Sequence, residues 1–121
     1  MAIEISLPES RKYQIVRVTE PITTEVSHEL ARQTEAYAER TGVHARLFDV
    51  RATTNVSTVT SIYDLAYKDL EELGIERATR AAILVSTEDH SHDFVEVALR
   101  NSGFNARKFT EEAAAVAWLE E

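Results

Sequence analysis

Two histidines and two aspartates lie together in the pentapeptide Asp89-His90-Ser91-His92-Asp93. Imidazole and carboxylate groups are common metal ligands. On a helix, however, residues two apart point about 200° away from each other, so His90 and His92 can converge on one ion only in an extended loop. The carboxylates equally suit the first turn of a helix, where they complement the helix dipole. We therefore keep His90 and His92 as candidate ligands only and expect no metal and no cofactor.

A second candidate is a hydroxyl-rich loop in the polar stretch 51–61, formed by Asn55, Ser57, Thr58, Thr60 and Ser61. Loop hydroxyls beside the unpaired N–H groups that open a helix can bind an anion or a phosphorylated side chain. The alternative is that Thr60 or Ser61 caps the helix and the other hydroxyls are only hydrated. We consider this loop a candidate contact for a protein partner or an anion.

Tyr63 and Tyr67 are four residues apart, beside the apolar stripe of an expected helix. Such a pair can belong to the core, or it can form an exposed patch that favours a two-fold dimer. It can also line a pocket for an apolar ligand, together with Tyr37, Phe94 and Trp118. Between the dimer and the ligand pocket, we expect the dimer.

Asp69 falls within the apolar stripe of the same helix, where a buried carboxylate is costly without a partner. It could meet a basic residue such as Arg80, line a cavity between helix and sheet, or lie on the rim of the stripe next to Lys68. The last arrangement is the one we favour, because buried aspartates are rare. For His28 and His44 the sequence offers no partner, and we expect them at the surface or at a strand end.

The sequence contains no recognisable catalytic motif. It has no GxSxG nucleophile elbow, no Gly-rich phosphate loop and no cysteine, and adjacent carboxylates such as Glu71 and Glu72 point apart on a helix. We therefore expect a noncatalytic protein.

The amino-acid composition indicates the class of protein and the kinds of partner it can have. Of 121 residues 44% are hydrophobic and 28% charged, a balance typical of a globular domain. We expect one domain over residues 1–121. The formal charge of −8 disfavours nucleic acid and anionic membrane surfaces as partners. Without a long apolar run or a leader peptide, we expect no stable membrane insertion, and the absence of cysteine favours a cytoplasmic location.

Hydrophobic spacing predicts strands alternating with helices. Strands are expected at 2–7, 13–18, 43–50, 81–85 and 104–109, the first two forming a hairpin. A first helix is capped by Thr23 or Thr24 and ends at Gly42; further helices are expected at about 61–73, 89–102 and 110–119. Strand 43–50 is apolar on both faces and needs helices on both. The fold class is α/β, with a mostly parallel sheet of four or five strands, an N-terminal hairpin and four helices.

The C-terminal half resembles a known family. The residues that carry the resemblance are Phe94, Ala98 and the segments 80–85 (RAAILV), 103–112 (GFNARKFTEE) and 117–119 (AWL). They are similar to the SpoIIAA-like family of bacterial STAS domains, which is related in fold to the CRAL-TRIO lipid-transfer proteins. The resemblance implies a single-domain β-α sandwich and a small cytoplasmic protein.

The family's antagonists of anti-sigma factors carry an Asp-Ser-Ser-Gly-like phosphoacceptor turn after the strand that corresponds to 43–50. Here the turn reads TTNVST at 53–58, without the glycine or the acidic residue. This departure argues against regulation by a partner kinase.

These observations lead to one prediction and one alternative. The prediction is a noncatalytic, cytoplasmic STAS-like interaction or regulatory domain that forms a homodimer and contacts a protein partner. The alternative is a small carrier that holds a hydrophobic or lipid-like ligand between helices and sheet, which requires a cavity of several hundred Å³.

Overall fold

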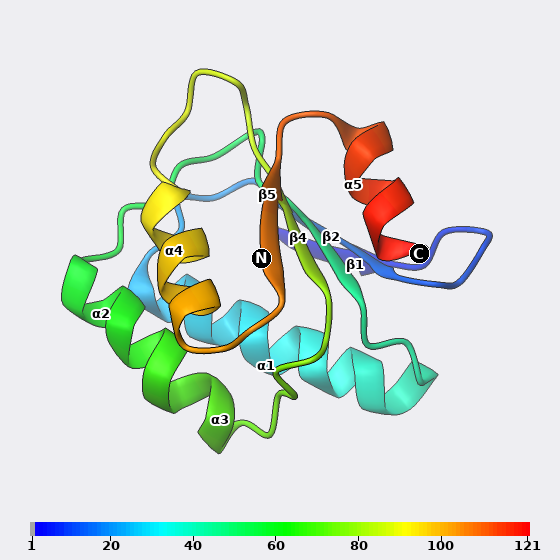
Figure 1. The fold of residues 1–121 in the computed structure, drawn as a ribbon, viewed down its shortest axis with the longest axis horizontal. Helices are drawn as coiled ribbons and strands as arrows, with labels where there is room; N and C mark the ends of the chain where they lie inside the picture. The colour runs from blue at the N-terminus through cyan, green and yellow to red at the C-terminus, as the bar shows by residue number, and fades with distance from the viewer. Residues whose placement is uncertain (1) are drawn as a thin grey trace.

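An antiparallel hairpin begins the fold in the computed structural model, which describes residues 2–121 (Figure 1). Its strands are β1 (Ile3–Ser6) and β2 (Gln14–Val18). In the connecting turn Arg11 has a φ of 56°, and its N–H donates to the carbonyl of Pro8 over 3.0 Å. The hairpin that the sequence predicts is confirmed.

Three further strands extend the sheet: β3 (Arg46–Asp49), β4 (Ala81–Leu84) and β5 (Ala106–Phe109). The spatial order is β1-β2-β3-β4-β5, and every pair from β2 onward is parallel. Parallel neighbours need crossover connections, which are almost always right-handed. Because each new strand is added on the same side of the previous one, all three crossovers lie over one face of the sheet.

Two crossover helices, α1 (Thr24–Thr41) and α4 (Asp93–Asn101), pack directly on that face. Thr23 caps α1 by accepting the Val26 N–H at 3.2 Å, and Gly42 ends it with a φ of 77°, as the sequence predicts. Val95 and Leu99 of α4 complete a core that consists of Val16, Val18, Ile22, Leu30, Val50, Ile83 and Val85.

The opposite face of the sheet is covered by the C-terminal helix α5 (Glu112–Leu119). Its buried side chains pack on the other set of strand residues in a core of Tyr13, Leu47, Ala82, Leu84, Ala115, Trp118 and Leu119. Strand β3 therefore contacts helices on both sides, as its two apolar faces require.

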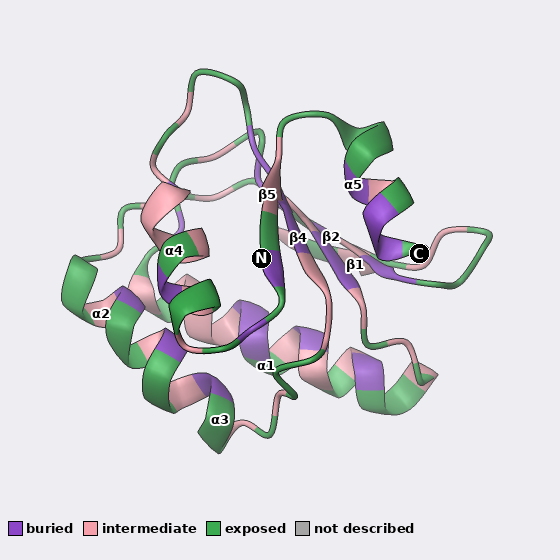
Figure 2. Cartoon of the chain, viewed as in Figure 1, coloured by how far each residue is buried: buried purple, intermediate pink, exposed green. Residues whose placement is uncertain are grey.

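The middle crossover helix occupies a different position. It consists of three consecutive parts: α2 (Val59–Asp64), a π-helical turn η1 (Leu65–Asp69) and α3 (Leu70–Glu72). Ile62 and Ala66 pack on Ala98 of α4, whereas Leu70 packs on Ala31 of α1. The helix thus bridges α1 and α4 as an outer layer, with buried and exposed residues alternating along it (Figures 1 and 2).

Several boundaries differ from the expected ones. Helix α2 begins at Val59 rather than at about 61 because Thr58 caps it, and α4 begins at Asp93 rather than 89 because residues 86–92 form turns. Val97 of α4 is 48% exposed. Among residues 2–121 no helix has the length and apolar character that crossing a membrane requires.

Strand β5 forms one edge of the sheet. The backbone N–H of Lys108 in this strand donates to Oε2 of Glu96, on α4, over 2.6 Å. Unpaired N–H groups on an edge strand are templates for pairing with another chain. Glu96 occupies this one with a side chain of the same molecule.

We predict that Leu84→Ala lowers the free energy of unfolding by about 3 kcal/mol, the usual loss when a buried leucine is truncated. Leu84 is fully buried in the inner strand β4, beneath α5. Chemical denaturation would measure the change. Val97→Ala is the matched control, because its side chain is 48% exposed and its truncation should change stability by less than about 0.5 kcal/mol. Equal losses in the two variants would contradict the assigned core.

Candidate functional site

The loops that follow β2, β3 and β4 meet at the carboxyl edge of the parallel strands. Ile22 and Asn55 form an isolated parallel bridge, with the Val56 N–H donating to the Ile22 carbonyl over 2.9 Å. The Asn55 N–H donates to Oγ of Ser91 over 2.9 Å. These contacts hold the hydroxyl-rich loop between two neighbouring loops, at the edge where ligands and partners of parallel sheets commonly bind.

Most hydroxyls of this loop already have partners within the protein. Ser57 donates to the Ile22 carbonyl over 3.2 Å, while its N–H donates to Oδ1 of Asn55 over 2.8 Å. Oγ1 of Thr58 accepts the Ser61 N–H at 3.1 Å and lies 2.7 Å from the Ser61 hydroxyl. The capping residue is therefore Thr58, not Thr60 or Ser61. Thr60 is exposed, and the loop presents an ordered surface.

The two candidate metal ligands separate. His90 is exposed, with Nδ1 3.1 Å from Oδ2 of Asp93. His92 is buried, with Nε2 3.3 Å from Oδ2 of Asp89 and 3.4 Å from the Thr53 carbonyl. Within residues 2–121 no three His, Asp or Glu side chains are placed to share an ion. His92 instead links the loop after β4 to the loop after β3.

The carboxylates beside these histidines are stabilised in their charged form. Burial alone would raise the pKa of Asp89, but hydrogen bonds from Ser91 and the nearby His92 hold it below its usual value. The pKa of Asp93 is lowered mainly by its hydrogen bond with Lys108, with a further contribution from His90. Both groups act as charged anchors for the start of α4.

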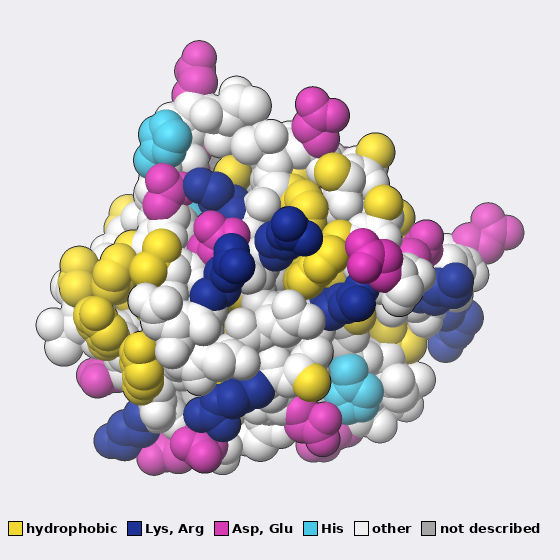
Figure 3. All heavy atoms as spheres, viewed as in Figure 1, with side chains coloured by type: hydrophobic (Ala, Val, Ile, Leu, Met, Phe, Trp, Pro, Cys, Tyr) yellow, Lys and Arg dark blue, Asp and Glu magenta, His cyan; other side chains and the backbone are white. Residues whose placement is uncertain are grey.

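Tyr63 and Tyr67 lie on the outer surface of α2 and η1, where they are 47% and 48% exposed. Their rings stack with centroids 5.6 Å apart, and Phe94 of α4 meets Tyr63 edge-on at 5.4 Å. The alternative grouping with Tyr37 and Trp118 is not formed, because Tyr37 lies beneath Arg40 on α1 and Trp118 is in the core on the opposite face of the sheet. Hydrophobic side chains gather over α2 and α4 in Figure 3.

Asp69 pairs with a residue that the sequence did not point to. Its Oδ2 lies 2.6 Å from Nε2 of His28, on α1, and both side chains are partly buried. Arg80 is elsewhere, donating to the Trp118 carbonyl. The sequence offered no partner for His28, and the contact forms because the two helices that carry this pair pack side by side. The pair ties η1 to α1.

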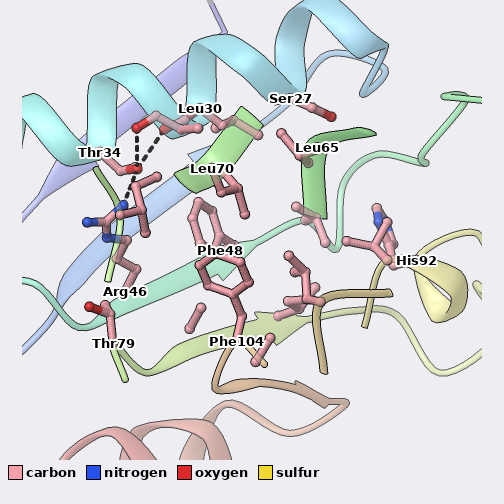
Figure 4. Close-up of a pocket in the computed structure, with 18 of the residues that line it drawn as sticks. Ser27, Leu30, Thr34, Arg46, Phe48, Leu65, Leu70, Thr79, His92 and Phe104 are labelled. Carbon is pink, nitrogen blue, oxygen red and sulfur yellow. Dashed lines mark hydrogen bonds between the residues drawn. The ribbon is translucent and has the colours of Figure 1, made fainter. Parts of the chain in front are cut away.

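A cavity of about 140 Å³ lies between the sheet and the bridging helix (Figure 4). Apolar side chains from α1, β3, η1, α3 and α4 dominate its wall, among them Leu30, Phe48, Leu65, Leu70, Leu99 and Phe104. The cavity is smaller than the several hundred Å³ expected of a lipid carrier, and neither Tyr63 nor Tyr67 lines it.

Arg46 closes one end of the cavity, although it is only 3% exposed. It donates to Oγ1 of Thr34 over 2.9 Å, to Oε1 of Glu35 over 2.5 Å and to the His44 carbonyl over 2.9 Å. A buried cation is tolerable only when it is paired in this way. Sequence reasoning missed Arg46; its place directly before the apolar pair Leu47 and Phe48 in a strand expected to be buried was the available signal.

Asp49 and Arg51 fix the chain where β3 leads into the hydroxyl-rich loop. The guanidinium of Arg51 donates to both carboxylate oxygens of Asp49, over 2.9 and 2.8 Å. The hydrogen bond from Arg51 is the main reason why the pKa of Asp49 lies below its usual value; burial opposes it, and Arg17 adds to it.

Comparison with known proteins identifies the fold. No family model and no curated protein matches the sequence. One solved structure that matches is an uncharacterized protein of the DUF3478 family with a SpoIIAA-like fold from Shewanella loihica PV-4, at a TM-score of 0.62, 18% identity and coverage of 98% of this chain and 92% of that one. Another is the Bacillus cell fate determinant SpoIIAA in the phosphorylated form, at a TM-score of 0.51, 11% identity and coverage of 97% and 99%. The chain has a SpoIIAA-like STAS fold.

This SpoIIAA-like fold confirms the resemblance drawn from the C-terminal half. The turn at residues 53–58, which lacks the acidic residue and the glycine of a phosphoacceptor turn, is the loop held against Ile22 and Ser91. The site that the structure offers is therefore this loop together with the exposed helix α2 that follows it.

We predict that Glu35→Gln destabilises this SpoIIAA-like fold by about 3 kcal/mol, because it leaves the buried guanidinium of Arg46 without a counter-charge. The side chains of Arg46 and Glu35 are 4% and 15% exposed. Thermal and urea unfolding would measure the loss. Glu29→Gln, which removes an ion pair with the exposed Arg32 on the same helix, should cost much less. A similar loss in both variants would show that burial of the Arg46 pair is not decisive.

We predict that Asp49→Asn makes the free energy of unfolding less dependent on pH in the acidic range. Because the pKa of Asp49 is lowered in the folded protein, its ionised form favours folding. That contribution is complete above the unfolded pKa of about 3.9 and is lost as the pH falls through the folded value. The stability difference between wild type and variant should therefore be largest near neutral pH and shrink in acid. Urea titrations at several pH values test this, with Glu9→Gln, at an exposed position in the hairpin turn, as control; a difference that is constant with pH would refute it.

Proposed function

We propose that this chain is a noncatalytic STAS-type regulatory domain, one unit over residues 1–121, that acts in the cytoplasm through protein–protein contacts and forms a homodimer. The observation that carries the proposal is an exposed apolar ridge along α2 and η1, which we define as Val59, Tyr63 and Tyr67. Their exposed fractions are 59%, 47% and 48%. Large exposed apolar groups gathered on one helix are typical of interaction surfaces.

The ridge is complementary to a second copy of itself. Its three residues are spaced by four, so they form one line along the helix. Beside this line lie the exposed residues Asp64 and Lys68, also spaced by four. When two such helices meet antiparallel about a two-fold axis level with Ala66, Asp64 of each copy faces Lys68 of the other. A two-fold contact of this kind satisfies both charges while the tyrosines cover each other.

The hydroxyl-rich loop at the start of α2 is the proposed contact for a different protein. Asn55, Ser57, Thr58 and Ser61 keep it ordered through internal hydrogen bonds, and Thr60 and the 57% exposed Val56 extend its surface. An ordered loop loses little conformational entropy on binding. The charge of −8 supports a protein partner over nucleic acid.

The noncatalytic assignment is supported by the roles of the histidines. His28 is engaged with Asp69, and His92 is buried against the Thr53 carbonyl and Asp89. These groups hold segments of the fold together.

We predict that the wild-type chain is dimeric in native mass spectrometry and light scattering, and that Lys68→Asp yields monomers because it places two carboxylates opposite each other. The double variant Asp64→Lys with Lys68→Asp restores the opposite charges and should dimerise again. Tyr63→Ser should weaken the dimer, whereas Tyr37→Ser, on the far part of α1, should leave it intact.

A wild-type monomer at all concentrations would refute the homodimer. Failure of the charge-reversed double variant to recover dimerisation, with its circular dichroism and melting temperature unchanged, would refute the antiparallel contact through this ridge.

A further inference from the structure

The cavity beneath the bridging helix is not used by the proposed protein contacts. Its floor is the sheet, its walls are α1 and α4, and its roof is η1 with α3 (Figure 4). The space exists because three residues with small side chains line it: Ala31, Ala81 and Ala106. Native cores contain few voids larger than one water molecule. A space of about 140 Å³ at this place is therefore large enough to receive a ligand.

The volume limits the size of that ligand. An apolar cavity of about 150 Å³ lined by Leu, Ile and Phe stays dry and binds benzene. The cavity here has nearly that volume and a mainly apolar lining, and it is partly open to solvent. It fits one ring of about six to eight heavy atoms and excludes an acyl chain. Phe48 and Phe104, both in the lining, offer ring edges and faces to an aromatic guest.

The charged groups around the cavity determine which charge state of a ligand it can bind. At one end Arg46 is neutralised by Glu35 and also bonded to Thr34. At the other end His92 is held by Asp89 and the Thr53 carbonyl. The third ionisable residue of the lining, Glu76, is exposed and stays hydrated. No buried, uncompensated charge therefore faces the cavity, so an ionised ligand would lose its hydration without a counter-charge in return.

We propose that this cavity binds one small, neutral, monocyclic aromatic molecule. The ligand enters beneath the roof, because the bridging helix packs mainly on α1 and α4 and its displacement breaks no strand pairing. Leu65 and Leu70 of the roof contact the bound ring from above, and the Asp69–His28 contact holds the roof against α1.

Toluene is the probe, and benzoate is its charged counterpart of similar shape. We expect millimolar toluene to raise the melting temperature of the wild-type protein in a concentration-dependent manner, as mass action requires for a ligand of the folded state. Benzoate at the same concentrations should produce no rise. Chemical-shift changes in nuclear magnetic resonance spectra should locate toluene next to Phe48 and Phe104.

Ala31→Leu tests the position, because it places a larger apolar side chain in the cavity from α1. The variant should bind toluene at least about tenfold more weakly without a lower melting temperature of its own. Tyr63→Ser, on the outer side of the same roof, is the matched control and should bind toluene as the wild type does. It also separates this site from the proposed dimer, since it weakens only the latter.

Leu70→Ala provides an independent test should Ala31→Leu fold poorly. It enlarges the cavity from the roof, so the variant should accept a larger ring such as naphthalene, which the wild type should exclude. Absence of any shift in melting temperature or spectra with toluene would overturn the proposal. Unchanged toluene affinity in a folded Ala31→Leu variant, or exclusion of naphthalene by Leu70→Ala, would also overturn it.

Discussion

The rest of the structure depends on how many helices fit on one face of a narrow parallel sheet. Strands lie about 4.8 Å apart, so β2 to β5 span only about 14 Å, whereas packed helices need about 10 Å each. The sequential strand order sends three crossover helices to that face. Two of them, α1 and α4, occupy it. The third is raised into an outer layer, which creates both the cavity beneath it and the exposed ridge above it.

Polar contacts fix α1 against the sheet at one end of this cavity. The buried Arg46 joins the start of β3 to Thr34 and Glu35 of α1. Gln14 of the adjacent strand donates to the carbonyls of Thr34 and Val43, while its own Oε1 is buried and has no hydrogen-bond partner in the described part of the chain. Such groups contribute less to stability than apolar packing would, but they fix the register of helix against sheet.

Local signals made most of the fold predictable from the sequence. Thr23 and Gly42 mark the ends of α1, and the alternation of side chains along two short strands marks the hairpin. Both signals depend on residues that are close in the chain. The candidate site was harder to predict from the sequence. The contact between His28 and Asp69 joins residues 41 positions apart, and the cavity results from which alanines meet across three layers. The cap at Thr58 was displaced from the expected Thr60 or Ser61 because all three residues can cap a helix and only tertiary contacts decide among them.

The carboxylate of Glu96 on the edge of β5 has a consequence for assembly. An open strand edge allows copies to add one after another without limit, which leads to fibres and precipitates. With the Lys108 N–H occupied from within the molecule, growth by strand addition at this side is obstructed. Association through a helix surface, by contrast, ends once two copies have covered each other. The carboxylate of Glu96 thus protects this edge against strand-to-strand polymerisation.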